Sequence, residues 1–140
     1  MRIKCLACEA LARVVYLCAA HSSHIIDVEL FRIGLHREPA ELRARLQARI
    51  DAANEEDVLP GSEGTPVQPY DAVAMVYGLC GQSTAGLVAR DVPLVIPRAH
   101  DCITLFLGDR ERYGESFREH PGTYWYALHY IERNTGSSNA

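Results

Sequence analysis

Apolar residues are distributed along the chain in two patterns, one of which is typical of buried strands. Residues 3–7 form a short, mainly apolar run, and residues 72–77 are apolar without interruption. An unbroken apolar run indicates a central parallel strand that is covered on both faces. Residues 24–31 instead alternate between apolar and polar positions, which indicates a half-buried edge strand. A fourth strand is predicted at residues 94–96, ending before Pro97.

The second pattern, with apolar residues at helical spacing, follows the strands. A helix is predicted directly after Cys8, and residues 39–50 place apolar residues four apart behind a proline suited to the first helical turn. Further helices are predicted at residues 83–88 and after the capping residues Asp101 and Asp109. This order predicts an α/β fold, a Rossmann-like three-layer sandwich on a parallel sheet of about four strands in the order 2-1-3-4.

One domain accounts for the whole pattern. A chain of 140 residues has the size of a single domain, and we assign residues 1–130 to it. The stretch 54–69 is rich in proline, glycine and acidic residues with little to bury, so a mobile loop is expected there. A disordered tail is expected at residues 131–140, which end in small polar residues.

Composition and charge limit which kinds of binding partner and which cellular compartment are expected for this protein. The net charge of −4 and the absence of a long basic run argue against nucleic acid as a partner. The apolar part of the N-terminus breaks at Glu9 and Arg13, too early for a signal peptide or a membrane span, so a cytoplasmic protein is expected. Five cysteines, an odd number, then favour buried hydrophobes, metal ligands or reactive thiols over a disulfide framework.

Three cysteines and one histidine are predicted to meet at the carboxyl edge of the sheet. Cys8, Cys80 and Cys102 each follow a predicted strand, and His100 lies beside the last of them. Thiolate and imidazole together suit zinc, iron or an iron–sulfur cluster, so these four residues are candidate ligands of a soft metal. The alternatives are a reactive thiol pair without metal and plain packing of the strand ends. At a helix N-terminus, Cys8 is expected to have a lowered pKa.

Several other residues near this edge are candidates for binding or catalysis. Glu9 is a candidate general base beside the thiols, and Tyr124–Tyr126 either wall a pocket or cover the sheet edge. Cys5 and Cys18 are expected in the core, and the remaining histidines in loops or on the surface. Glycine lets a ligand approach the backbone closely. Arginine side chains near a helix N-terminus can hold an anion; the alternative is that these arginines only form ion pairs on the surface. The candidate ligand-binding residues are Gly78, Gly81, Arg98, Arg110 and Arg112.

Five stretches carry a resemblance to a known family: Ala7–Glu9, Tyr77–Gly81, Val92–Leu105, Arg110–Tyr113 and Pro121–Tyr126. On these motifs, nearly all of residues 1–130 resembles the uncharacterised family called domain of unknown function 1638. The resemblance implies no reaction, although members often occur in gene neighbourhoods that handle methyl groups and corrinoids. Lys4 departs from the family pattern by interrupting the first strand.

Two functional hypotheses follow. The first is a domain that binds a soft metal ion or a metal-containing cofactor, linked to one-carbon or corrinoid metabolism, with an unknown small ligand. The second is a non-enzymatic binding or interaction module, such as a subunit of a homo-oligomer, whose cysteines only pack the core. Neither hypothesis names a substrate or decides whether the protein is an enzyme.

Overall fold

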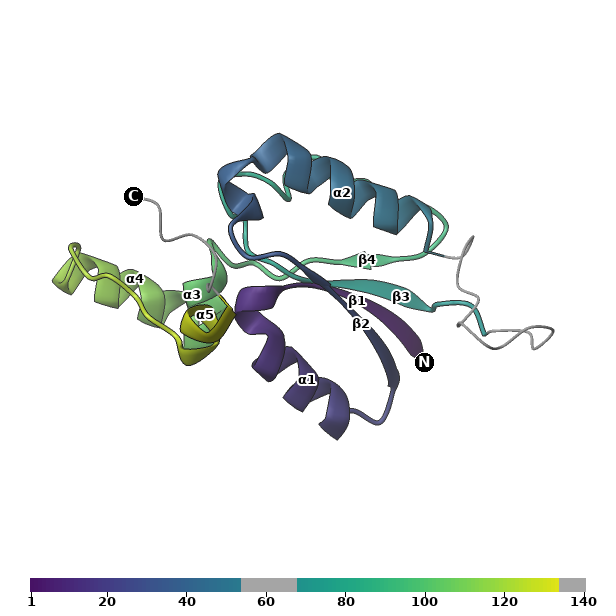
Figure 1. Ribbon diagram of the computed structural model, residues 1–140, viewed down its shortest axis with the longest axis horizontal. Helices are drawn as coiled ribbons and strands as arrows, with labels where there is room; N and C mark the ends of the chain where they lie inside the picture. The colour runs from purple at the N-terminus through teal and green to yellow at the C-terminus, as the bar shows by residue number, and fades with distance from the viewer. Residues whose placement is uncertain (54–67, 134–140) are drawn as a thin grey trace.

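The computed structural model describes residues 1–53 and 68–133, which form strands and helices around one sheet (Figure 1). The elements follow the strand and helix pattern expected from the apolar spacing. In chain order they are β1 (Arg2–Cys8), η1 (Glu9–Leu11), α1 (Ala12–His21), β2 (Ile25–Phe31), η2 (Leu35–Arg37), α2 (Pro39–Asp51), β3 (Ala72–Val76), β4 (Leu94–Val95), α3 (Cys102–Leu107), α4 (Arg110–Glu119) and α5 (Leu128–Arg133).

The sheet has four strands, all parallel, in the order β2-β1-β3-β4. In this register Ile3 of β1 lies between Ile26 of β2 and Ala72 of β3, while Val73 of β3 pairs with Leu94 of β4. Both the parallel arrangement and the strand order predicted from the sequence are confirmed. The order places β1 and β3 side by side with their crossovers leaving in opposite directions, which creates a crevice at their carboxyl ends.

Helices cover both faces of the sheet, as a three-layer sandwich requires. On one face α2 buries Leu42, Leu46 and Ile50, each at most 2% exposed, against the sheet. On the other face Leu11 and Val15 pack with sheet residues into a second cluster. Figure 1 shows α3, α4 and α5 gathered at the end of the sheet away from the N-terminus, which is where the strands end. The candidate site therefore lies between these helices and the strand ends.

Two basic residues are buried in the central strand without breaking it. The Arg2 guanidinium lies 4.3 Å from the Tyr70 ring centre and donates a 2.7 Å hydrogen bond to Asp27. The Lys4 ammonium lies 5.5 Å from the same ring, and the residue is only 3% exposed. The expectation that Lys4 interrupts the strand is wrong, because β1 runs through it and the Tyr70 ring provides a favourable cation–π environment.

Two predicted segments differ from the structure. Residues 83–86 form turns and residues 87–88 are irregular instead of a helix, because Gly86 within this segment has φ +83° and a right-handed helix cannot continue through it. Conversely, α5 forms where the sequence indicated an irregular end.

Two expectations from the sequence concern segments that lie partly outside the residues that the structure describes. Of the expected mobile loop, residues 54–67 lie outside the described residues. Of the expected tail, residues 131–133 belong to α5 and residues 134–140 lie outside the described residues. Among the helices that the structure describes, none is long and apolar enough to cross a membrane.

Candidate functional site

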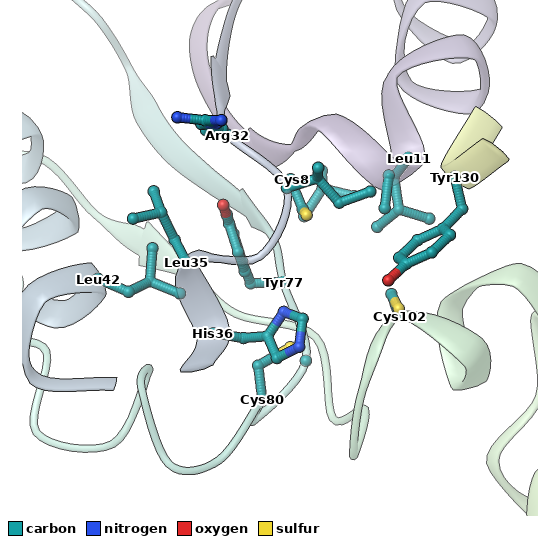
Figure 2. A pocket seen from close by; sticks show the side chains of 14 residues that line it. Cys8, Leu11, Arg32, Leu35, His36, Leu42, Tyr77, Cys80, Cys102 and Tyr130 are labelled. Carbon is teal, nitrogen blue, oxygen red and sulfur yellow. The ribbon is translucent and has the colours of Figure 1, made fainter. Parts of the chain in front are cut away.

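The thiols of Cys8, Cys80 and Cys102 come together at the carboxyl ends of the strands (Figure 2). Cys8 is the last residue of β1, Cys80 lies in the turn after β3, and Cys102 opens α3 after β4. All three line one cavity of about 30 Å³. A water molecule needs about 10–15 Å³ of such space, so this thiol cavity has room for a water molecule or a single ion but not for an organic molecule. The structure thus brings the three predicted cysteines to one edge of the sheet.

Backbone hydrogen bonds hold the segments of Cys80 and Cys102 against each other. The Leu79 amide donates to the Ala99 carbonyl at 2.9 Å, and the Cys80 amide donates to the His100 carbonyl at 3.0 Å. The contact requires a glycine, because a Cβ atom on Gly78 would lie 2.6 Å from the Asp101 backbone. The close approach that Gly78 permits is therefore an approach of two chain segments.

The turn that carries Cys80 has an unusual backbone. Cys80 has φ +44°, Gly81 +65° and Gln82 +68°, so three successive residues lie in the left-handed region. For a residue with a side chain this conformation is unfavourable and persists only where the surroundings enforce it. Arg43 of α2 helps to fix the turn by donating a 2.7 Å hydrogen bond to the Gln82 carbonyl. Gly81 supplies positive φ here, and it also lines the larger cavity described below.

Burial keeps the three thiols protonated in the absence of a cation. It raises the pKa of Cys80 to about 11 and that of Cys102 to about 12; the charge of Cys8 raises the pKa of Cys80 further, and the charges of Cys80 and Cys8 raise that of Cys102. Burial also raises the pKa of Cys8. The expected lowering of the Cys8 pKa is wrong, because the interactions of Cys8 with the Ala10 backbone and the Tyr77 side chain, which lower its pKa, do not outweigh the loss of hydration.

Tyr77 places a phenol next to these thiols. Its side chain is 3% exposed and lines the thiol cavity, and its hydroxyl interacts with the Cys8 thiol. Burial, followed by the charges of Cys8 and Cys80, raises the pKa of the Tyr77 hydroxyl far above its ordinary value. Tyr77 is thus neutral at all physiological pH values and can only donate or accept a hydrogen bond.

The histidine that reaches the thiol cavity is His36, which the sequence analysis left without a role. Figure 2 shows its imidazole beside the Cys80 side chain, and His36 lines the cavity. Burial of the ring, and then the charge of Arg37, lowers the pKa of His36, so the imidazole is neutral at neutral pH. The signal in the sequence was indirect: the loop after β2 must begin at the same carboxyl edge as the loops after β1 and β3.

His100 faces away from the thiol cavity. Its side chain is 71% exposed, its Nδ1 lies 3.0 Å from the Asp101 carboxylate, and its ring stacks on Tyr113 at 6.0 Å between centroids. His100 lines a second, larger cavity together with Asp101. The structure therefore brings together the three predicted cysteines and leaves the predicted histidine at the neighbouring cavity.

The second cavity, which we call the aromatic cavity, has a volume of about 740 Å³. It adjoins the thiol cavity, since four residues line both: His36, Cys80, Cys102 and Tyr130. Figure 2 shows the Tyr130 hydroxyl directed toward Cys102. Of the two expectations for Tyr124–Tyr126, the pocket wall is confirmed, because all three residues line this cavity and both tyrosines are 71% exposed.

The remaining candidates lie outside both cavities. Glu9 accepts a 3.1 Å hydrogen bond from the Ile33 amide and lies 3.5 Å from the Arg133 guanidinium, so its carboxylate joins the loop after β2 to α5. Arg98, Arg110 and Arg112 are exposed and line neither cavity. The helix N-terminus after Gly81 that was to share an anion with these arginines does not form.

Two cysteines remain outside the site. Cys5 is buried in the sheet, as expected, and its pKa is raised to about 11 by burial and then by Cys18. Cys18 is exposed on α1, so its predicted place in the core is wrong. The helical spacing of α1 is real, but its buried side consists of Ala12 and Val15, next to Leu11 of η1, and Cys18 lies outside that face.

Together, the parallel sheet and the two cavities at its carboxyl edge define a small Rossmann-like α/β protein with a thiol-lined site. Within the described ranges, no three histidine, cysteine, aspartate or glutamate side chains are arranged to hold a metal ion. The chain belongs to the family described as Protein of unknown function (DUF1638), whose model matches residues 30–135. No curated protein and no solved structure matches the chain.

Proposed function

We propose that the protein binds a soft metal ion, alone or within a cofactor, at the thiol cavity. The observation that carries this proposal is the convergence of Cys8, Cys80 and Cys102, from three separate strand ends, on a space of about 30 Å³. Thiolates are preferred ligands of zinc and iron, and such a space suits one ion. A rotation of the thiols toward a common centre is part of the proposal, since their described positions do not yet form a metal site.

The electrostatics of the cluster support this proposal. The thiols repel one another once they are ionised: the charge of Cys8 raises the pKa of Cys80, and the charges of Cys80 and Cys8 raise that of Cys102. A bound cation removes that repulsion and displaces the protons, so metal binding and thiol ionisation are coupled. His36 is the imidazole best placed to complete the site, because it lies beside Cys80 and is held neutral, the form that coordinates metal.

The test is metal binding by untagged protein purified anaerobically. We expect about one equivalent of zinc or iron, or of added Co²⁺ with a thiolate charge-transfer band, and an affinity that rises with pH because protons are released. Cys80→Ser and Cys102→Ser should lose at least about tenfold in affinity, whereas the exposed Cys18→Ser should not. His36→Gln should weaken binding, and the matched His100→Gln should leave it unchanged.

A second candidate is a binding module whose cysteines only fill space. It is favoured by the burial of the thiols, which keeps them neutral without a cation. Less than roughly a tenth of an equivalent of metal in the native protein, and no cobalt band on titration, would leave this second candidate standing. A link to one-carbon or corrinoid metabolism, a cytoplasmic location and a homo-oligomer remain predictions, and no reaction is assigned.

A further inference from the structure

The aromatic cavity differs from the thiol cavity in size and in the chemistry of its walls. Its volume of about 740 Å³ lies within the range of about 300–1,000 Å³ that is typical of sites for organic ligands. Phe106, Tyr124, Trp125, Tyr126 and Tyr130 line it. Aromatic walls contribute large apolar surfaces that stack on flat rings, so this cavity suits a planar ligand.

The rim of the cavity is formed by aromatic side chains that water still reaches. Tyr124 and Tyr126 are each 71% exposed, and their ring centres lie 4.8 Å apart at 44°. Neither ring is buried by another element of the described chain, so a ligand that covers them removes apolar surface from water. The two rings present tilted faces and edges, an arrangement that can adjust to a flat guest.

The charged groups that line the cavity determine whether it favours a positively or a negatively charged ligand. Among the residues that the structure describes, no lysine or arginine lines it, whereas the Asp101 carboxylate does. That carboxylate accepts a 3.0 Å hydrogen bond from the Tyr113 hydroxyl and lies 3.0 Å from His100 Nδ1. An anionic ligand would meet a carboxylate and the negative faces of several rings, with only the imidazoles of His36 and His100 to compensate it.

We propose that the aromatic cavity binds a flat aromatic cation, such as an N-alkylated heteroaromatic ring, next to Cys80 and Cys102. Ring faces and a carboxylate together attract a delocalised positive charge, which is less costly to dehydrate than a compact one. The same walls disfavour ligands that carry phosphate or carboxylate groups. This inference does not rest on the metal proposal, because Cys80 and Cys102 enter it only as part of the wall shared with the thiol cavity.

The chain provides its own reporter for the test, since Trp125 is the only tryptophan and lines the cavity. Three probes with the same ring system separate charge from shape: 1-methylquinolinium, quinoline and quinoline-2-carboxylate. We expect a saturable change in Trp125 fluorescence with 1-methylquinolinium, and a dissociation constant about tenfold lower than that of quinoline. Quinoline-2-carboxylate should show no saturable binding. Calorimetry on the same samples distinguishes binding from collisional quenching.

Matched variants locate the binding. Tyr126→Leu should weaken 1-methylquinolinium binding about tenfold, whereas Tyr16→Leu, an exposed tyrosine on α1 outside the cavity, should not change it. Asp101→Asn keeps a side chain that can cap α3, and it should abolish the preference for the cation while preserving quinoline binding. Cys80→Ser should retain 1-methylquinolinium binding even where it loses metal, which separates this inference from the metal proposal.

Two outcomes would overturn the inference. One is equal affinity for the three probes, which would show that the cavity does not select positive charge. The other is an equal effect of Tyr126→Leu and Tyr16→Leu, which would show that the probe binds elsewhere. Circular dichroism melting of each variant establishes that a loss of binding reflects the site and not the fold.

Discussion

Cys80 combines a thiol at the candidate site with a backbone conformation that side chains rarely adopt. Its φ of +44° lies in the left-handed region, where a residue with a Cβ atom costs about 1–2 kcal/mol. Glycine would remove that cost, yet the position holds a cysteine. Backbone strain of this kind gathers at functional sites, where the surrounding structure holds it in place. The strain thus supports a role for the thiol itself.

The strain predicts an unusual order of stability for two variants. In the metal-free protein we expect Cys80→Gly to be more stable than Cys80→Ala by about 1 kcal/mol, because only glycine adopts this conformation freely. Both variants lose the thiol, so their difference isolates the backbone. Urea unfolding of the two proteins gives the comparison. A Cys80→Ala protein as stable as Cys80→Gly would mean that the turn is not strained.

At the scale of elements, the helix caps are the local features that the sequence predicted best. Asp101 Oδ1 accepts hydrogen bonds from the Ile103 and Thr104 amides at 3.0 and 3.1 Å, and Asp109 caps α4 in the same way. Such caps depend only on residues a few positions away. The same Asp101 carboxylate accepts a 3.0 Å hydrogen bond from the Tyr113 hydroxyl, which joins α3 to α4. Nothing in the local sequence pattern indicates that contact.

Two glycines should respond in opposite ways to the same substitution. Gly78→Ala should destabilise the fold by about 1–3 kcal/mol, because its Cβ would lie 2.6 Å from the Asp101 backbone and separate the two segments that position Cys80 and Cys102. Gly114→Ala is the control, since α4 is helical there and nothing lies within 4 Å of the added Cβ. This variant should gain about 0.5–1 kcal/mol from the higher helix propensity of alanine.

Thermal melting of both glycine variants, with metal content measured on the same samples, provides the comparison. Equal melting temperatures for Gly78→Ala and Gly114→Ala would contradict the close approach of the segments at Gly78. A Gly78→Ala protein that folds should also show weaker metal binding than Gly114→Ala, because its thiols are displaced.

The elements that the sequence misplaced are those whose structure depends on distant contacts. The turn at residues 80–86 is fixed by left-handed backbone angles and by Arg43 of α2, neither of which appears in a local apolar pattern. Helix α5 is held by ion pairs of Glu132 with Arg13 and of Arg133 with Glu9, so its partners lie at the other end of the chain. Local propensity carries no information about such pairs.

For the whole molecule, the position of the cysteines was predictable and their surroundings were not. Parallel strands must end at one edge, so the placement of Cys8, Cys80 and Cys102 after strands already predicted their meeting. The pocket wall at Tyr124–Tyr126 was one of two expectations, but His36 and the rest of the aromatic cavity were not predicted because they depend on how η2 and α5 pack onto that edge. The pKa values of the cysteines could not be predicted for a related reason, because they depend on burial, which is a property of the folded molecule.

The alkylation rates of the five cysteines should report how deeply each thiol is buried in the molecule. At neutral pH, with no metal bound, we expect iodoacetamide to modify the exposed Cys18 first. The thiols of Cys5, Cys80 and Cys102 should react at least about tenfold more slowly, because burial shields them and raises their pKa values to about 11 or 12.

Mass spectrometry of peptides at several times gives these rates, and unfolded protein provides the control in which all thiols react alike. The slow rates should increase about tenfold per pH unit while pH stays below the pKa, since only the thiolate reacts. A Cys80 that reacts as fast as Cys18 at neutral pH would contradict the raised pKa.

The buried Lys4 has a consequence for the register in which β1 pairs with its neighbouring strands. It lies in β1 near the Tyr70 ring, four positions before Cys8, and alternate residues of a strand face the same side. A shift of β1 by one residue would turn Cys8 away from the thiol cavity, and it would also move the Lys4 ammonium to the apolar side packed with Leu11 and Val15. Burying an ammonium there is costly. Lys4, although unusual in a central strand, thus destabilises the mispaired sheets in which the three cysteines would not meet.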